Sequence, residues 1–77
     1  MEGELNMDST ADIRDKFSTN LLLMLKRTNI TKAELARRID ATDTTINRYI
    51  NGTAEPKLTM LYRIAEVFDC SIDDLIF

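Results

Sequence analysis

Apolar residues recur at helical spacing in five stretches of the chain, separated by residue types that begin or end helices. No stretch shows the strict alternation of apolar and polar residues expected of a half-buried strand. The pattern predicts a compact all-α domain of five helices. A chain of 77 residues has room for one such domain and for no second folded module.

The first predicted helix runs from Ala11 to Arg27, with Ser9 or Thr10 as its cap. Residues 1–10 lack periodicity, so we expect a flexible acidic tail there, which could also extend the helix. The domain itself is therefore expected over residues 11–77. The inner face of the helix is formed by Phe17, Leu21, Met24 and Leu25.

Leu22 and Leu23 lie on flanks of this helix that are usually polar, so they need a partner. Three interpretations are open: packing against residues 10–16, burial in a homodimer, or contact with a further part of the protein after Phe77. The dimer and the C-terminal extension are favoured equally over the first interpretation.

Thr31 and Glu34 form a predicted capping box, in which the hydroxyl accepts the Glu34 amide and the carboxylate returns to the Thr31 amide. A second helix is therefore expected from Lys32 to Asp40. Asp40 is of a type that tolerates the left-handed conformation, which suits a helix end. The inward positions of this helix are Leu35, Ala36 and Ile39.

Thr42 is the predicted cap of a third helix over residues 43–50, which Asn51-Gly52 ends. Two short helices joined by a tight turn, here within residues 32–51, are typical of the unit whose second helix reads DNA. Its inward positions are Ile46, Tyr49 and Ile50, and its outward positions, all polar, are Asp43, Thr44, Asn47 and Arg48.

A fourth helix is expected to begin near Pro56 and to end at Asp69. Ser71 and Asp74 form a second capping box, which predicts a short fifth helix. The expected inward residues of these two helices are Leu58, Leu61, Ile64, Ala65, Phe68, Ile72, Leu75 and Ile76.

Charge is distributed unevenly along the chain, whose net charge is -3. Residues 1–16 carry five acidic and two basic side chains, and residues 55–77 carry the same numbers. Residues 26–48 carry six basic and three acidic side chains, so the middle is locally basic. This division suits a protein that presents one face to phosphates, although a solvated helix face is an equally good interpretation of charge alone.

The chain has few of the residue types that catalyse reactions or bind metals. It has no histidine and one cysteine, Cys70, so neither an imidazole base nor an internal disulfide is available, and neither a metal nor another cofactor is expected. A buried packing thiol is the favoured interpretation of Cys70. The longest apolar run, Leu21–Leu25, is too short for a membrane span, and the acidic start does not fit a signal peptide. We expect a cytoplasmic protein.

Residues 17–77 resemble the phage-repressor and Cro-like helix-turn-helix family, also called the XRE family. The matching patterns are Ile30-Thr31-Lys32-Ala33-Glu34-Leu35-Ala36, Ile46-Asn47-Arg48-Tyr49, Asn51-Gly52, Pro56-Lys57-Leu58 and Cys70-Ser71-Ile72-Asp73-Asp74-Leu75. The resemblance implies a lambda-repressor-like five-helix domain. It also implies binding to double-stranded operator DNA, generally as a two-fold dimer on a palindrome, with the third helix in the major groove.

The resemblance also assigns roles within residues 30–57. Thr44 and Arg48 become the main base readers, since arginine pairs with guanine and a threonine methyl group can meet a thymine methyl group. The flanking residues expected to take part in base reading are Thr42, Asp43 and Asn47. The residues expected to contact phosphates are Thr31, Lys32, Thr45, Asn51, Thr53 and Lys57. Asp43 is favoured as a helix cap over a base reader.

The chain departs from the family in three places. Glycines are common there where this chain has Asn29, Asp40 and Asp69, all residues that can adopt the left-handed conformation. Leu25 and Ile50 stand where many members have a buried ion pair, a replacement that is often neutral or stabilising. The loop at residues 53–56 lacks the usual basic residues, so low nonspecific DNA affinity is expected.

Three classes of function compete. Sequence-specific DNA binding by a transcriptional regulator, most simply a repressor, is favoured by Thr44 and Arg48, which have no core role. The alternative is a protein-interaction module on the same fold, with DNA binding weakened by the acidic ends. An enzyme is the least supported class, because no nucleophile with a base and no phosphate-binding glycine loop is present.

Overall fold

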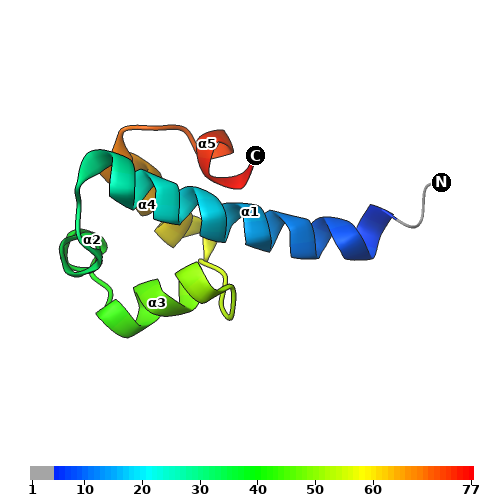
Figure 1. Ribbon diagram of the computed structural model, residues 1–77, viewed down its shortest axis with the longest axis horizontal. Coiled ribbons are helices and arrows are strands. Elements are labelled where there is room, and N and C mark those ends of the chain that lie inside the picture. The colour runs from blue at the N-terminus through cyan, green and yellow to red at the C-terminus, as the bar shows by residue number, and fades with distance from the viewer. Residues whose placement is uncertain (1–4) are drawn as a thin grey trace.

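The computed structural model of the protein describes the backbone of residues 5–77 and the side chains of residues 13–77. Five helices follow one another (Figure 1): α1 (Leu5–Thr28), α2 (Lys32–Ile39), α3 (Asp43–Asn51), α4 (Leu58–Phe68) and α5 (Asp73–Ile76). Since residues 5–77 contain no strand, the predicted all-α fold with five helices is confirmed.

Helix α1 begins at Leu5, not at the predicted Ala11. Residues 5–10 contain neither proline nor glycine, so a helix held by packing further along the chain can propagate through them. The N-terminal part of α1 projects beyond the other four helices (Figure 1). Because residues 10–16 belong to the same continuous helix as Leu22 and Leu23, they cannot fold back over those leucines, and that interpretation is wrong. Residues 1–4 of the predicted tail lie outside the described residues.

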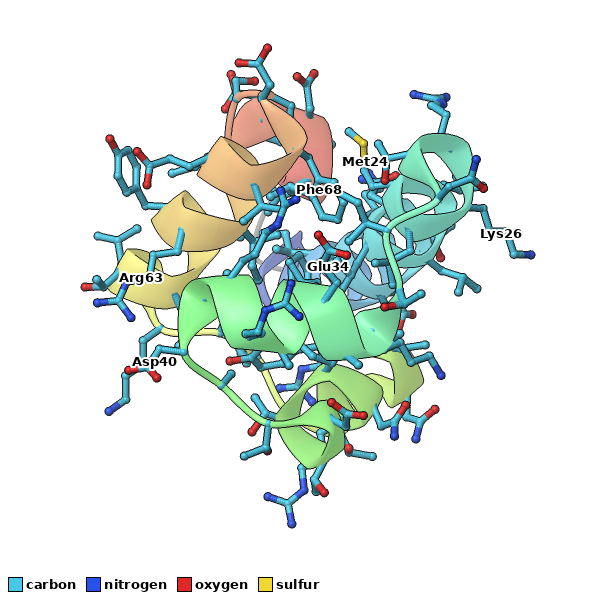
Figure 2. The ribbon with its side chains drawn as sticks, turned by 90° about the vertical axis from the view of Figure 1, so that its left-hand side faces the viewer. Met24, Lys26, Glu34, Asp40, Arg63 and Phe68 are labelled. Carbon is cyan, nitrogen blue, oxygen red and sulfur yellow. The ribbon has the colours of Figure 1, made fainter. Side chains whose placement is uncertain are left out.

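The helices enclose one apolar core. Helix α1 packs against α3 and α5, and α2 packs against α3 and α4. Phe68 points from α4 into the middle of the bundle, whereas Lys26 and Asp40 point outward (Figure 2). The buried residues are Phe17, Leu21, Leu25, Leu35, Ala36, Ile39, Ile46, Tyr49, Ile64, Ala65, Phe68 and Leu75. Leu25, which stands where an ion pair is common, is therefore part of this core, and Ile50 packs against it.

Leu58 is the one predicted core residue of α4 that the structure leaves outside, with 75% of its surface exposed. It is the first residue of α4, and side chains in a helix lean toward the N-terminus. Leu58 therefore leans toward the preceding loop instead of the core. Leu61, one turn later, packs against the core as predicted.

Three helices end with a residue in the left-handed conformation: Asp40 after α2, Gly52 after α3 and Asp69 after α4. In each case the next residue donates a backbone hydrogen bond to the carbonyl five positions earlier, at distances of 2.8, 3.0 and 3.0 Å. Asn29 also has a positive φ, of 59°. The predicted tolerance of these positions without glycine is confirmed.

The second predicted capping box is complete. The amide of Asp74 donates to Ser71 Oγ at 3.2 Å, and the amide of Ser71 donates to Asp74 Oδ2 at 3.1 Å. Asn20 of α1 donates to the carbonyl of Leu75 at 3.0 Å, which ties α5 to α1. Within residues 5–77, no helix is long and apolar enough to cross a membrane.

Candidate nucleic-acid interface

Helices α2 and α3 form the predicted pair, joined by residues 40–42. Leu35 and Ile39 of α2 are fully buried, and so is Ile46 of α3. Ala36 is also buried on α2, the helix that packs directly on α3. These contacts anchor both helices to the core, so the orientation of α3 is determined by packing.

The outer face of α3 is polar and exposed. The buried side chains Ile46 and Tyr49 occupy the opposite face. Of the residues predicted to contact DNA from this helix and its cap, the exposed ones are Thr42, Asp43, Thr44, Asn47, Arg48 and Asn51. Residues three or four positions apart are neighbours on a helix surface, so the structure brings these side chains together on one face.

Thr42 and Thr45 are engaged with one another at the start of α3. Thr42 Oγ1 accepts from the amide of Thr45 at 3.2 Å, and the two hydroxyl oxygens lie 3.1 Å apart. Thr42 is thus the cap that the sequence predicted. Thr45 is half-buried, which makes it the least accessible of the predicted phosphate contacts.

The N-terminus of α2 lies beside this face. Thr31 Oγ1 accepts from the amide of Glu34 at 3.1 Å, which leaves its own hydroxyl hydrogen to donate elsewhere. Lys32 Nζ donates to Asn47 Oδ1 of α3 at 3.0 Å. A predicted phosphate contact and a predicted base reader are therefore joined directly.

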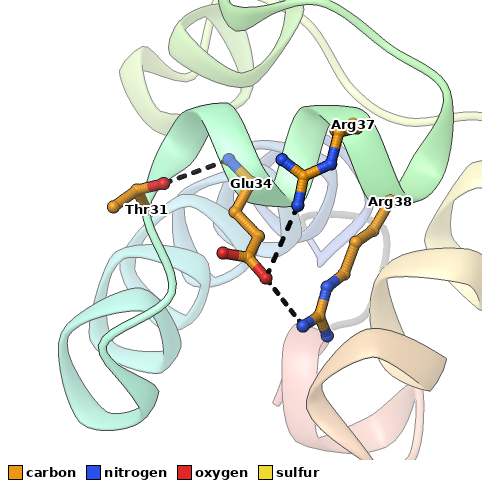
Figure 3. A network of polar contacts seen from close by, with 4 residues as sticks. All are labelled: Thr31, Glu34, Arg37 and Arg38. Atoms are coloured by element: carbon orange, nitrogen blue, oxygen red, sulfur yellow. Dashed lines mark hydrogen bonds and ion pairs between the residues drawn. The ribbon is translucent and has the colours of Figure 1, made fainter.

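The first capping box forms only in part. The carboxylate of Glu34 pairs with Arg38 at 2.7 Å and with Arg37 at 3.8 Å (Figure 3) instead of turning back to the amide of Thr31. Two guanidinium groups, three and four residues further along, offer charge-assisted bonds that outweigh one amide. Both arginines are exposed and partly neutralised by Glu34, which favours solvated helix residues over phosphate contacts.

The C-terminal end of α3 leads into the loop with the remaining predicted phosphate contacts. The amide of Thr53 donates to the carbonyl of Arg48 at 3.0 Å, and its hydroxyl donates to the same oxygen at 3.3 Å. Thr53 therefore helps to close α3. Asn51 and Lys57 are exposed on either side of it, and Lys57 is also the N-cap residue of α4.

Sequence reasoning placed Phe17 on the inner face of α1 but missed the contacts of Phe17, Ser18 and Arg14 that hold α3 and the loop after it. Ser18 Oγ donates to the carbonyl of Tyr49 at 2.7 Å, and the rings of Phe17 and Tyr49 meet edge to face with centroids 5.8 Å apart. Arg14 pairs with Glu55 of the following loop at 3.3 Å. The one signal in the sequence for the bond to Tyr49 was Ser18, a small polar residue next to Phe17 on the inner face of α1.

Within residues 13–77, burial raises the pKa of two groups. Burial raises the pKa of the Tyr49 hydroxyl. Burial also raises the pKa of the Cys70 thiol, with smaller contributions from the charges of Asp74 and Asp69. Neither group is an activated nucleophile, since activation would need a lowered pKa. Among the residues described, no cluster of three or more acidic, cysteine or histidine side chains could hold a metal ion.

Comparisons with known proteins agree with this geometry. A family model described as helix-turn-helix matches residues 22–75. The solution structure of the SOS-response transcriptional repressor LexA from Eubacterium rectale is 28% identical, with a TM-score of 0.79 over 84% of this chain and 69% of that chain. The crystal structure of FeII HppE is 30% identical, with a TM-score of 0.78 over 84% of this chain and 34% of that chain. No curated protein matches the sequence.

Proposed function

Because the chain belongs to the phage-repressor and Cro-like helix-turn-helix family of DNA-binding transcription regulators, we propose that it is a repressor that places α3 in the major groove of its operator. The observation that carries this proposal is the composition of α3. Its exposed face is polar throughout, while Ile46 and Tyr49 anchor the opposite face in the core. Because its buried face anchors α3 to the core, the opposite face can contact base edges while the packing of the helix stays intact.

Base recognition is assigned to Thr44 and Arg48, with Asn47 beside them. The guanidinium of Arg48 can form two parallel hydrogen bonds with guanine, and the methyl group of Thr44 can contact thymine. Thr42 and Asp43 lie at the start of α3, where Thr42 is the cap and the charge of Asp43 favours the positive end of the helix dipole. These two residues border the base-reading surface.

Phosphate contacts are assigned to the two ends of the helix pair. Thr31 and Lys32 lie at the start of α2, where the amide of Glu34 is capped by Thr31 and the amides of Lys32 and Ala33 are the ones assigned to meet a phosphate. Asn51, Thr53 and Lys57 follow the end of α3 and are exposed there. Thr45 contributes less, because it is half-buried and bonded to Thr42. These contacts position the helix and carry no sequence information.

A homodimer on a palindromic operator completes the proposal. Leu22 and Leu23 are 36% and 50% exposed on α1, so each leaves part of its apolar surface open to a partner. A two-fold contact through these leucines would pair two copies of α3 with two half-sites. A further segment of a longer protein is the competing occupant of the same leucines.

The test is selection from a randomised duplex library, comparing the protein with Arg48→Ala and with Arg37→Ala as a matched control. Arg37 is exposed on α2 and belongs to none of the assigned contacts. The unaltered protein and the control should enrich the same palindromic site, whereas Arg48→Ala should relax preference at one base position in each half. If the unaltered protein enriches no site at low salt, the proposal is wrong and the protein-interaction module takes its place.

A further inference from the structure

Lys32 and Asn47 are joined across the helix pair. The ammonium of Lys32, the first residue of α2, donates to Oδ1 of Asn47 in the middle of α3 at 3.0 Å. Both side chains are exposed, so the contact lies on the outer surface of the helix pair and not in its core.

The chemistry of the pair determines which way the Asn47 amide points. A lysine ammonium has three donors and no acceptor, so only the oxygen of the amide can meet it. The amide nitrogen, with its two hydrogens, is therefore turned away from Lys32. At the outer face of α3, Asn47 therefore presents the two donors of its nitrogen, while its oxygen is directed toward Lys32 and accepts one bond from it.

We propose that Lys32 determines the base specificity of Asn47, so that in the major groove Asn47 prefers keto bases to adenine and, most strongly, to cytosine. This inference rests on the proposed role of α3 as the helix that reads the major groove. Guanine and thymine present the acceptors O6 and O4 there, which an outward amide nitrogen can donate to. Cytosine presents only an amino group, which would face that nitrogen donor to donor. Adenine presents an amino group beside its acceptor N7, so it retains one acceptor and is disfavoured less than cytosine.

An asparagine without such a neighbour behaves differently. It pairs with adenine by donating to N7 and accepting from the N6 amino group, which requires its oxygen to be available. Lys32 turns that oxygen toward α2 and takes one of its two lone pairs, which weakens the two-bond pairing with adenine and leaves the single bond to N7. Every base pair contains one keto and one amino base, so Asn47 distinguishes the two orientations of a pair.

The test measures binding to duplexes that differ at the single position at which Asn47→Ala relaxes preference. The unaltered protein should prefer the keto base there, and Lys32→Met should shift the preference toward adenine by about fivefold or more. Lys32→Arg keeps a donor and a charge at this place, so it should retain the keto preference. Lys57→Met, a second exposed lysine assigned to phosphate, should weaken binding to all duplexes equally.

The outcomes separate this inference from the function it rests on. If Lys32→Met weakens binding uniformly with unchanged base preference, Lys32 is a phosphate contact alone and the inference is overturned while the proposed function stands. If the unaltered protein prefers adenine at this position, the inference is also overturned. In the double variant Lys32→Met with Asn47→Ala, the loss of Lys32 should no longer alter base preference, and a remaining shift would contradict the coupling. Failure of the unaltered protein to select any duplex would overturn both.

Discussion

Ser18 of α1 donates a hydrogen bond of 2.7 Å to the main-chain carbonyl of Tyr49, two residues before the end of α3. That carbonyl also accepts the amide of Gly52 at 3.2 Å, so Ser18 adds a second donor to the end of α3 from a neighbouring element. The edge-to-face contact of Phe17 with the Tyr49 ring lies beside it. Helix α1 therefore fixes the C-terminal end of the helix that is proposed to read DNA.

Ser18→Ala should lower the free energy of unfolding by about 1 kcal/mol, since it removes one hydrogen bond and adds no strain. In a domain of this size, the melting temperature should fall by roughly 4–8 °C. Thr19→Ala, at the next and exposed position of α1, is the control and should have little effect. Equal melting temperatures for the two variants would show that Ser18 does not stabilise the end of α3.

Asp40→Gly should raise the free energy of unfolding by about 0.5 kcal/mol, because glycine adopts the left-handed conformation without steric cost. Asp40 has a φ of 63° and a ψ of 46°. Asp43→Gly, at the first residue of α3, should have the opposite effect and cost about 0.5 kcal/mol, since glycine weakens a helix and the charge at its positive end is lost. Urea denaturation measures both changes. A loss of stability in Asp40→Gly would contradict this prediction. It would mean that the aspartate side chain stabilises the fold by more than the left-handed backbone of Asp40 destabilises it.

Leu22→Glu or Leu23→Glu should convert a dimer to a monomer, because a charge cannot be buried unpaired in an apolar contact. The helical content should remain, since both side chains are exposed in the single chain. Sedimentation velocity of each variant provides the measurement, with Thr19→Glu on the same helix as the charge control. A sedimentation profile and melting temperature unchanged in both leucine variants would exclude a partner at this surface.

Cys70 should react slowly with iodoacetamide in the folded protein. Only the thiolate is nucleophilic, and the raised pKa of Cys70 keeps the thiol protonated even when the pH equals the ordinary pKa of a thiol. The rate should increase on unfolding in urea at the same pH. The same shift stabilises the fold below the unfolded-state pKa, and this contribution is lost as the pH rises through the folded-state pKa. A native rate equal to the unfolded rate would contradict the shift.

The helix limits could be predicted where a local signal defines them. Thr42 before α3 and Gly52 after it act through their own backbone neighbourhood, so the sequence suffices to place them. Helix α1 is already formed at Leu5, the first described residue, so its extent before the predicted Ala11 depends on how far a helix propagates from its packed part. Leu58 was misassigned because its spacing fits the core face but its position at the first turn tilts it away.

The candidate site also combines features that local sequence predicts with features that depend on packing. The polar face of α3 follows from helical periodicity alone. The bonds from Lys32 to Asn47 and from Ser18 to Tyr49 join residues 15 and 31 positions apart, so they depend on how the helices pack. The partners of Glu34 could not be chosen from the sequence either. An amide and two guanidinium groups all lay within its reach, and the relative strength of these bonds decided among them.

Within residues 13–77 the structure buries no charged side chain, and apolar Leu25 occupies a core position where an ion pair is common in the family. Stability that rests on apolar burial responds weakly to added salt, whereas exposed phosphate contacts respond strongly. Folding and DNA association are thus separable by ionic strength. A salt titration of duplex affinity should count the phosphates that are neutralised, at a slope of about 0.9 for each, while the protein itself remains folded.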